Sequence, residues 1–196
     1  MSRDAQATKK RILAVARSAF ARHGFDGTTI RSIAAAAGVA PNLITRYFGG
    51  KAGLFKAATS MELGVPAVLP GPRSSLGSRI AANVVKRWEA ADSTDALLMM
   101  LRSAGTSDVA AAELGNFFLE QAAEPLSEYL HQHLGYSRAE ADDRVAAAGS
   151  LILGVVMIRY VMRTGPLAAA EPSALTRWLG DRLQRLLQGP PPPPLR

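Results

Sequence analysis

The side chains best suited to recognition chemistry lie close together, between Asn42 and Lys51. Asn42 and Arg46 each carry paired polar groups that can make two hydrogen bonds to the edge of a nucleic-acid base. The hydroxyls of Thr45 and Tyr47 and the ammonium of Lys51 suit phosphate oxygens. This set predicts contact with a nucleic acid, provided that the backbone presents it on one surface.

Two short helices joined by a glycine turn can supply that surface. Thr28 or Thr29 can cap the first helix, and Gly38 supplies the turn after it. Pro41 suits the first position of the second helix, because no amide hydrogen is needed there. The first helix has an apolar face at helical spacing, formed by Ile30, Ile33, Ala34 and Ala37.

The second helix is expected to run to about Phe48. Ile44, Tyr47 and Phe48 recur at three- and four-residue spacing and can anchor it inward. The outward side chains are then Asn42, Leu43, Thr45 and Arg46. An ordinary helical hairpin in an all-α core is the alternative interpretation of this segment.

The charge distribution favours the nucleic-acid interpretation. Residues 1–56 contain ten Lys or Arg and only two Asp, a formal balance of +8 within a chain whose total is +7. A basic module joined to a nearly neutral body suits a phosphate backbone, because each neutralised phosphate releases counterions. The helix near Thr8–His23 could also lie on a membrane surface, but it offers too little bulky apolar area.

The ordered motifs of residues 8–58 resemble the DNA-binding domain of the tetracycline-repressor (TetR) family of bacterial transcriptional regulators. A first helix ends in HGFDGTT, IRSIAAAAGV follows, and a further helix ending in RYF leads into GGKAGLF. The ordered combination is far more specific than any one motif. The resemblance implies an N-terminal three-helix helix-turn-helix domain over residues 1–56.

The resemblance also assigns DNA contacts residue by residue. Thr29 and Arg31 would contact phosphates at the start of the second helix. Tyr47 and Lys51 would hold the DNA backbone. The residues that would enter the major groove are Ala40, Pro41, Asn42, Leu43, Thr45 and Arg46.

Two positions depart from the family pattern. Ala40 stands where the family commonly has a capping Ser, and the missing oxygen should cost the helix about 1 kcal/mol. Thr45 stands where Tyr is frequent, so one phosphate contact is shortened or lost. Either change could alter the preferred operator sequence.

The rest of the chain is expected to be helical. At 196 residues and 48% hydrophobic content the chain can bury a core, and the absence of cysteine excludes disulfides. No strand-like alternation appears, so the predicted class is all-α. The resemblance implies that residues 57–189 form a C-terminal helical regulatory domain that binds a ligand and forms a dimer. The expected helices are Lys51–Leu63, Ser78–Ala91, Thr94–Ser103 and Val109–Leu134, the last kinked or split by Pro125.

Two apolar helices expected near the end, Val145–Ile158 and Pro172–Gln188, predict a subunit interface. Val145–Ile158 lacks charges but is too short for a membrane span, so a helix buried by protein is favoured. In the family the last two long helices, which correspond here to Ser137–Thr164 and Pro172–Gln188, pair with their symmetry mates in a four-helix dimer interface. Dimerisation would allow two recognition helices, about 34 Å apart, to read a palindromic site together. The interface residues implied here are Ser150, Gly154, Leu175, Trp178, Leu179, Leu183 and Leu186.

The resemblance further implies a small-molecule effector bound among the C-terminal helices. An apolar or aromatic effector would suit a lining of Trp88, Met99, Phe117, Phe118, Gln121 and Met157. Each of the six can also be an ordinary core residue, because aromatic and Met side chains at helical spacing routinely pack cores. No cofactor or metal is expected, and residues 190–196 read as a disordered Pro-rich tail.

An enzyme is disfavoured because the chain lacks a phosphate-binding glycine loop, a HExxH motif and a nucleophile elbow. His131 and His133 are two residues apart and would diverge on a helix. The N-terminus lacks an apolar signal segment, which predicts the bacterial cytoplasm, the nucleoid when DNA is bound, and no membrane partner.

The combined prediction is a homodimeric repressor that binds double-stranded DNA at a palindromic operator and is released by a small molecule. A non-specific architectural DNA-binding protein and an all-α enzyme are the alternatives. The first uses the same basic surface but does not distinguish sequences.

Overall fold

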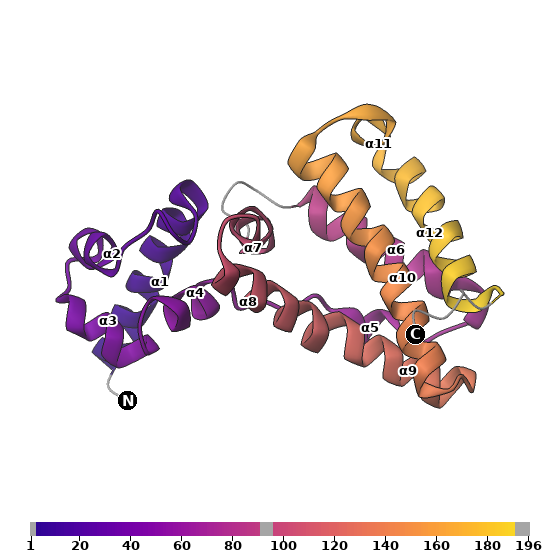
Figure 1. Cartoon of the computed structure of the whole chain (residues 1–196), viewed down its shortest axis with the longest axis horizontal. Helices are drawn as coiled ribbons and strands as arrows, with labels where there is room; N and C mark the ends of the chain where they lie inside the picture. Colours follow the sequence, from indigo (N-terminus) through magenta and orange to yellow (C-terminus); the bar gives the residue numbers. More distant parts are fainter. Residues whose placement is uncertain (1–2, 91–95, 191–196) are drawn as a thin grey trace. The chain divides into compact units, whose positions relative to one another are not determined.

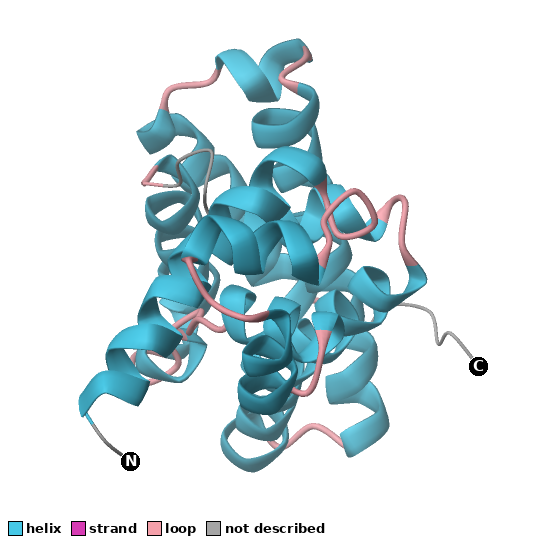
Figure 2. Ribbon diagram, turned by 90° about the vertical axis from the view of Figure 1, so that its left-hand side faces the viewer, coloured by secondary structure: helices cyan, strands magenta, loops and turns pink. Residues whose placement is uncertain are grey.

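The computed structural model describes residues 3–90 and 96–190 of the chain. Within those ranges every regular element is helical (Figures 1 and 2). The all-α class predicted from the sequence is therefore confirmed. The expected helix start at Thr94 and the tail at 191–196 lie outside the described residues.

The helices differ in length and some are joined end to end. In the first half of the chain they are α1 (Arg3–His23), α2 (Ile30–Ala37), α3 (Pro41–Phe48), α4 (Lys51–Thr59), α5 (Val65–Val68), the 3₁₀ turn η1 (Arg73–Ser75) and α6 (Leu76–Glu89). In the second half they are α7 (Ala96–Ala104), α8 (Asp108–Phe118), η2 (Leu119–Ala123), α9 (Glu124–Leu134), α10 (Arg138–Val156), η3 (Met157–Met162), α11 (Gly165–Ala169) and α12 (Pro172–Gln188).

The chain divides into two compact units. Unit 1 comprises Met1–Met61 and Ala91–Asn116, and unit 2 comprises Glu62–Ala90 and Phe117–Arg196. Unit 1 is thus larger than the segment 1–56 expected from sequence, because α7 and most of α8 join it. The reason lies in α7, whose residues Leu97 to Leu101 are all buried and which packs against α1 and α4.

The core of unit 1 is built on an aromatic cluster. Phe20 of α1 lies 5.0 Å from Phe55 of α4, and Phe25 lies 5.1 Å from Phe55, as centroid distances. Ile12 and Ala16 of α1 are fully buried beside them. Ile12, Ala16 and Phe20 recur on one face of α1, so they hold that helix against α2 and α4.

Helix α4 ends at Thr59, earlier than the expected Leu63. The Thr59 hydroxyl donates to the carbonyl of Phe55 at 2.8 Å, and Arg17 of α1 donates to the carbonyl of Ala58 at 2.9 Å. The bond from Arg17 satisfies a carbonyl that lacks an amide partner at the helix end. Ser60 then adopts an extended backbone.

Unit 2 is centred on the contact between α6 and α12. A Cβ atom added to Gly77 of α6 would lie 2.5 Å from the Gly180 carbonyl oxygen of α12, so only glycine permits this approach. The Gly77 amide donates to Gln184 Oε1 at 2.8 Å. Around this contact the buried leucines of α12 pack with α6 and with residues of α9 and α10.

The segment between the expected helices Lys51–Leu63 and Ser78–Ala91 is rich in Gly and Pro, and it contains the short helix α5. Arg79 of α6 stabilises it by donating to the carbonyls of Val68 and Leu69 at 2.8 and 2.7 Å. The long segment expected at Val109–Leu134 is split as predicted. Its break is the wide π-type turn η2, directly before Glu124 and Pro125.

The apolar segment Val145–Ile158, expected to be buried by protein, is only partly covered by its own chain. Leu153 is 39% exposed, and Ala146, Gly149 and Ser150 are exposed as well. By length and composition the stretch Arg138–Met162 could also cross a membrane, with 22% of its most apolar window buried. One such helix is weak evidence for a span, because core helices can have the same composition.

Candidate nucleic-acid interface

Helix α2 begins at a reciprocal cap formed by Thr29 and Ser32. The Ser32 amide donates to the Thr29 hydroxyl at 3.0 Å, and the Thr29 amide donates to the Ser32 hydroxyl at 3.3 Å. Of the two candidate caps, Thr29 is therefore the one used. Thr28 is buried instead, and its hydroxyl donates to the carbonyl of Gly24 at 2.8 Å.

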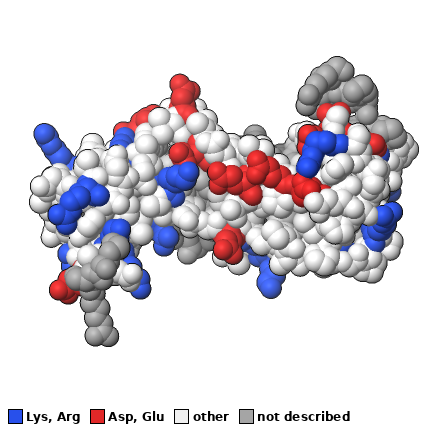
Figure 3. All heavy atoms as spheres, turned by 90° about the horizontal axis from the view of Figure 1, so that it is seen from below, with Lys and Arg blue, Asp and Glu red and all other residues white. Residues whose placement is uncertain are grey.

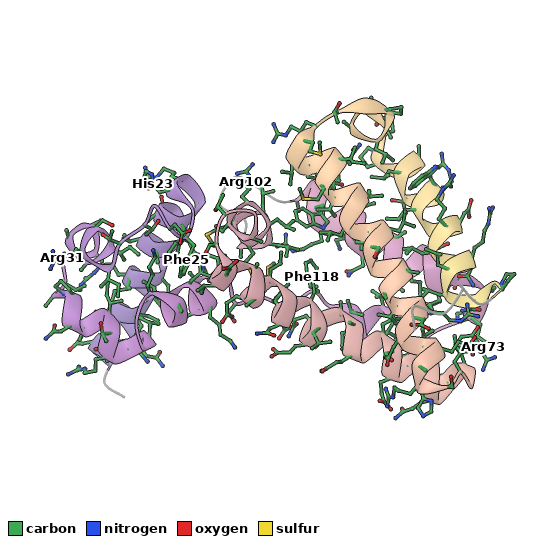
Figure 4. The ribbon with its side chains drawn as sticks, in the orientation of Figure 1. His23, Phe25, Arg31, Arg73, Arg102 and Phe118 are labelled. Atoms are coloured by element: carbon green, nitrogen blue, oxygen red, sulfur yellow. The ribbon has the colours of Figure 1, made fainter. Side chains whose placement is uncertain are left out.

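The cap leaves Thr29 and Arg31 exposed at the start of α2, as the sequence interpretation requires. Figure 4 shows Arg31 on α2 and Phe25 among the helices of the same unit. Arg31 makes no hydrogen bond or ion pair with the described residues. Its guanidinium is thus available to an anionic partner.

Gly38 makes the turn from α2 into α3. Its φ of 62° is left-handed, and its amide donates to the carbonyls of Ala34 and Ala35. Pro41 opens α3 at its first position, as predicted. Ala40 precedes it with an extended backbone and no side-chain hydrogen bond, so the missing cap expected from the sequence is confirmed.

Helix α3 presents its polar side chains outward. Ile44 is fully buried and anchors the helix, whereas Asn42, Thr45 and Arg46 are exposed. Ala40 and Pro41 are exposed beside them, and Leu43 is half-buried. The structure therefore places the six groove residues predicted from the sequence on one short helix and the residue before it.

The expected inward anchors Tyr47 and Phe48 are only half-buried. Their rings meet edge to face with centroids 6.3 Å apart, so they cover one another at the end of a helix with only eight residues. Lys9 of α1 places its ammonium 5.2 Å from the Tyr47 ring centroid, and Arg46 places its guanidinium 5.3 Å from it. Sequence reasoning missed Lys9, although Lys9, Ile12 and Ala16 share one helical face.

Lys51 opens α4 and is held in place from two sides. Its ammonium lies 4.4 Å from the centroid of the Phe25 ring and donates to the carbonyl of Asp26 at 3.4 Å. Neither partner neutralises the charge. Figure 3 shows Lys and Arg side chains over the N-terminal helices at the left of the view. The arrangement combines a polar helix face with fixed and unpaired cations, which is what DNA binding requires.

Comparison with known proteins decides the family. Residues 12–58 match the description "Bacterial regulatory proteins, tetR family", and residues 74–187 match "Tetracyclin repressor-like, C-terminal domain". The chain belongs to the TetR family. It is a transcriptional regulator of the repressor type, as the resemblance of the N-terminal motifs predicted.

Individual relatives of this TetR-family chain agree. The HTH-type transcriptional repressor SCO4008 of Streptomyces coelicolor is 42% identical over 62 residues, which are 32% of either chain. The TetR-family regulator SCO0857 of the same organism is 29% identical, with a TM-score of 0.66 over 92% of this chain and 94% of that one. A SmeT–triclosan complex is 19% identical, with a TM-score of 0.67 over 96% and 99% of the two chains, and shows the fold.

The residues expected to line an effector pocket are not all in one unit of this TetR-family protein. Met99 is buried in unit 1, whereas the other five belong to unit 2. Within unit 2, Trp88 is buried and stacks on Tyr160 with centroids 5.5 Å apart. Phe117, Phe118, Gln121 and Met157 are half-buried. A separate hollow of about 350 Å³ lies in unit 1, between α1 and α2.

Three of the expected interface residues are core residues instead. Leu175, Leu179 and Leu183 are at most 1% exposed, because α6 covers this side of α12. Their side chains cannot also contact another subunit. Ser150 is exposed, and Gly154, Trp178 and Leu186 are half-buried. The leucine stripe of α12 predicted that one face of the helix is buried, but it could not show whether α6 or another subunit covers that face.

Proposed function

We propose that this TetR-family regulator binds a palindromic DNA operator as a homodimer and is released from it by a small molecule. The observation that carries the proposal is the exposed face of α3, with Asn42, Thr45 and Arg46 pointing outward over a buried Ile44. Exposed Asn and Arg on a short helix after a glycine turn are suited to reading bases in the major groove.

The neighbouring residues would set the register of α3 on the duplex. Thr29 and Arg31 at the start of α2 would contact one stretch of phosphates. Tyr47 and Lys51 would contact another, since Lys51 is fixed beside Phe25 and keeps its charge. The segment 1–56 would thus act as the DNA-binding domain, supported in unit 1 by the packing of α7.

The exposed face of α10 supports the homodimer. Cβ atoms added to Gly149 and Gly154 would meet no atom within 4 Å, so another helix can approach closely there. The Ser150 hydroxyl donates to the carbonyl of Ala146 at 2.9 Å and would need no new partner when buried. Arg144 ties α10 to the end of α12 by donating to the carbonyls of Leu186 and Gly189 at 3.0 Å. In the dimer α10 would be covered by its symmetry mate.

An effector would act by favouring one of two states that differ in DNA affinity. The triclosan bound in the SmeT complex is a precedent on the same fold. Trp88, Phe117, Phe118, Gln121 and Met157 of unit 2 would suit an apolar or aromatic molecule with one polar group. We propose that the protein acts in the bacterial cytoplasm.

Competition binding at fixed salt tests the central claim. Labelled DNA from upstream of the protein's own coding region is challenged with the same unlabelled duplex and with random duplex. We expect the upstream duplex to compete at far lower concentration. Equal competition would contradict the operator and favour an architectural DNA-binding protein, which needs only the basic surface.

A footprint on the same upstream DNA tests whether the protein binds as a homodimer and whether a small molecule releases it. Protection should cover two half-sites about one helical turn apart, since two copies bind together. Candidate small molecules that abolish protection would be effectors. A Leu153→Glu variant should be monomeric by light scattering and should lose the footprint, because a charge would enter the proposed α10 contact. A dimeric Leu153→Glu variant would place the dimer contact elsewhere.

A further inference from the structure

The ring of Tyr47 contacts two cations that come from different helices. Lys9 belongs to α1 and approaches the ring to 5.2 Å, while Arg46 belongs to α3 and approaches it to 5.3 Å. Each distance is within the range of a cation–π contact. The Tyr47 hydroxyl makes no hydrogen bond to a described residue and can donate to an anion.

The position of Lys9 follows from how α1 is anchored. Ile12 and Ala16 are fully buried, and Lys9 is three residues before Ile12 on the same helical face. The packing of this face therefore brings the Lys9 stem to the edge of the core, where α3 ends. Lys10 is the next residue of α1 and therefore lies on a different face of the helix. It is exposed and makes no cation–π contact with Tyr47.

No acidic side chain neutralises this arrangement. The ion pairs between described residues all lie in unit 2, at Arg138, Arg144 and Arg159. The Lys9 ammonium lies beside the Tyr47 ring and is paired with no carboxylate of the described residues, so it can bind an anion at the end of α3. A phosphodiester oxygen can pair with the Lys9 ammonium and accept a hydrogen bond from the Tyr47 hydroxyl.

We propose that Lys9 and Tyr47 bind the same DNA phosphate, so that α1 takes part in holding the duplex together with α3. This inference rests on the proposed DNA binding and adds a residue from α1 to it. The contact contributes affinity for any sequence, because a phosphate carries no base identity. It also fixes the end of α3 relative to the backbone.

The salt dependence of binding tests the role of Lys9. Each neutralised phosphate contributes about 0.9 to the slope of log K against log [salt]. Lys9→Ala should lower the slope by about that amount on both the upstream duplex and random duplex. Lys10→Ala removes the same charge from the neighbouring position and should leave the slope unchanged. Equal slopes for the two variants would overturn the proposal.

A double-mutant cycle tests whether the phosphate is shared. Tyr47→Phe keeps the ring and should weaken binding about tenfold, because one hydrogen bond to a charged group is lost. If both groups bind one phosphate, the double variant should lose less affinity than the two single losses combined. Fully additive losses would show separate contacts. Lys9→Arg should retain the wild-type slope, and thermal unfolding of each variant checks that the fold is intact.

Failure of the Lys9 proposal can be distinguished from failure of the proposed operator binding. If wild-type protein bound the upstream and random duplexes equally, the operator would be lost as an explanation. The slope comparison between Lys9→Ala and Lys10→Ala would still decide the role of Lys9, because it needs no sequence preference.

Discussion

Arg159 and Glu89 form a two-point ion pair inside unit 2. The Nε and Nη2 atoms of Arg159 donate to Oε1 of Glu89 at 2.9 and 2.8 Å. The third nitrogen donates to the carbonyls of Leu167 and Ala170, both at 2.7 Å. Glu89 is the last residue of α6, so this contact holds that helix end to η3 and α11. The other end of α6 is held by the glycine contact with α12, and α6 is therefore fixed at both ends.

Glu89→Gln should destabilise the protein by about 1–2 kcal/mol. The cost lies between those of exposed and buried pairs, because the Arg159 side chain is 9% exposed and that of Glu89 is 35% exposed. Urea unfolding of the full chain measures it. Glu128→Gln is the matched control, since its pair with Arg138 is open to solvent and should leave the midpoint unchanged. Equal effects from both variants would contradict the structural role of Glu89.

Tyr160→Phe should change the stability at alkaline pH. Burial, together with the hydrogen bond from the Tyr160 hydroxyl to Glu89, raises the pKa of Tyr160 from 10.0 to about 12. Because the unfolded chain loses this proton first, the stabilisation is complete below pH 10 and is lost as the pH rises towards 12. The variant should show a shallower decline over that interval in unfolding measurements. Tyr129→Phe, which leaves the Glu89 contact in place, should decline as the wild type does.

Gly77→Ala should destabilise unit 2 by about 3 kcal/mol, near the upper end for overpacking. The added methyl would lie 2.4 Å from the Gln184 amide nitrogen, which is backbone and cannot rotate away. Thermal or urea unfolding measures the loss. Gly115→Ala in α8 meets no atom within 4 Å and should instead stabilise by up to about 1 kcal/mol, through helix propensity. If Gly77→Ala left the free energy of unfolding unchanged, α6 and α12 would have to be able to move apart.

Ala40→Ser should stabilise the DNA-binding segment by about 1 kcal/mol. Ala40 has the extended backbone of an N-cap residue, and a Ser oxygen there could accept from the amide of Asn42, the second residue of α3. Ala35→Ser in the exposed interior of α2 should be slightly destabilising and serves as the control. If both variants had the same unfolding midpoint, capping would not limit the stability of α3.

Arg46→Ala and Lys51→Ala should affect DNA binding differently. If Arg46 reads a base, its loss should cost about 1–3 kcal/mol on the upstream duplex and little on random duplex. Lys51→Ala should weaken both duplexes alike and lower the salt slope by about 1. Titrations at several salt concentrations measure both effects. The reverse result would exchange the roles of the two side chains.

Local patterns in the sequence were enough to predict the all-α class, the turn at Gly38 and the outward face of α3. The helix caps, the glycine turn and the buried Ile44 depend on residues a few positions apart, and their physics is contained in the local sequence. The family resemblance of residues 8–58 was confirmed for the same reason, because its motifs are contiguous.

Tertiary structure alone decided which helix covers which apolar stripe. Leu175, Leu179 and Leu183 read as an interface but are covered by α6, while the apolar face of α10 is left open. It also decided that α7 joins unit 1 and that Lys9 meets Tyr47 across 38 positions of sequence. Helical periodicity determines that a face is buried. The partner of that face depends on contacts between distant segments, which periodicity does not encode.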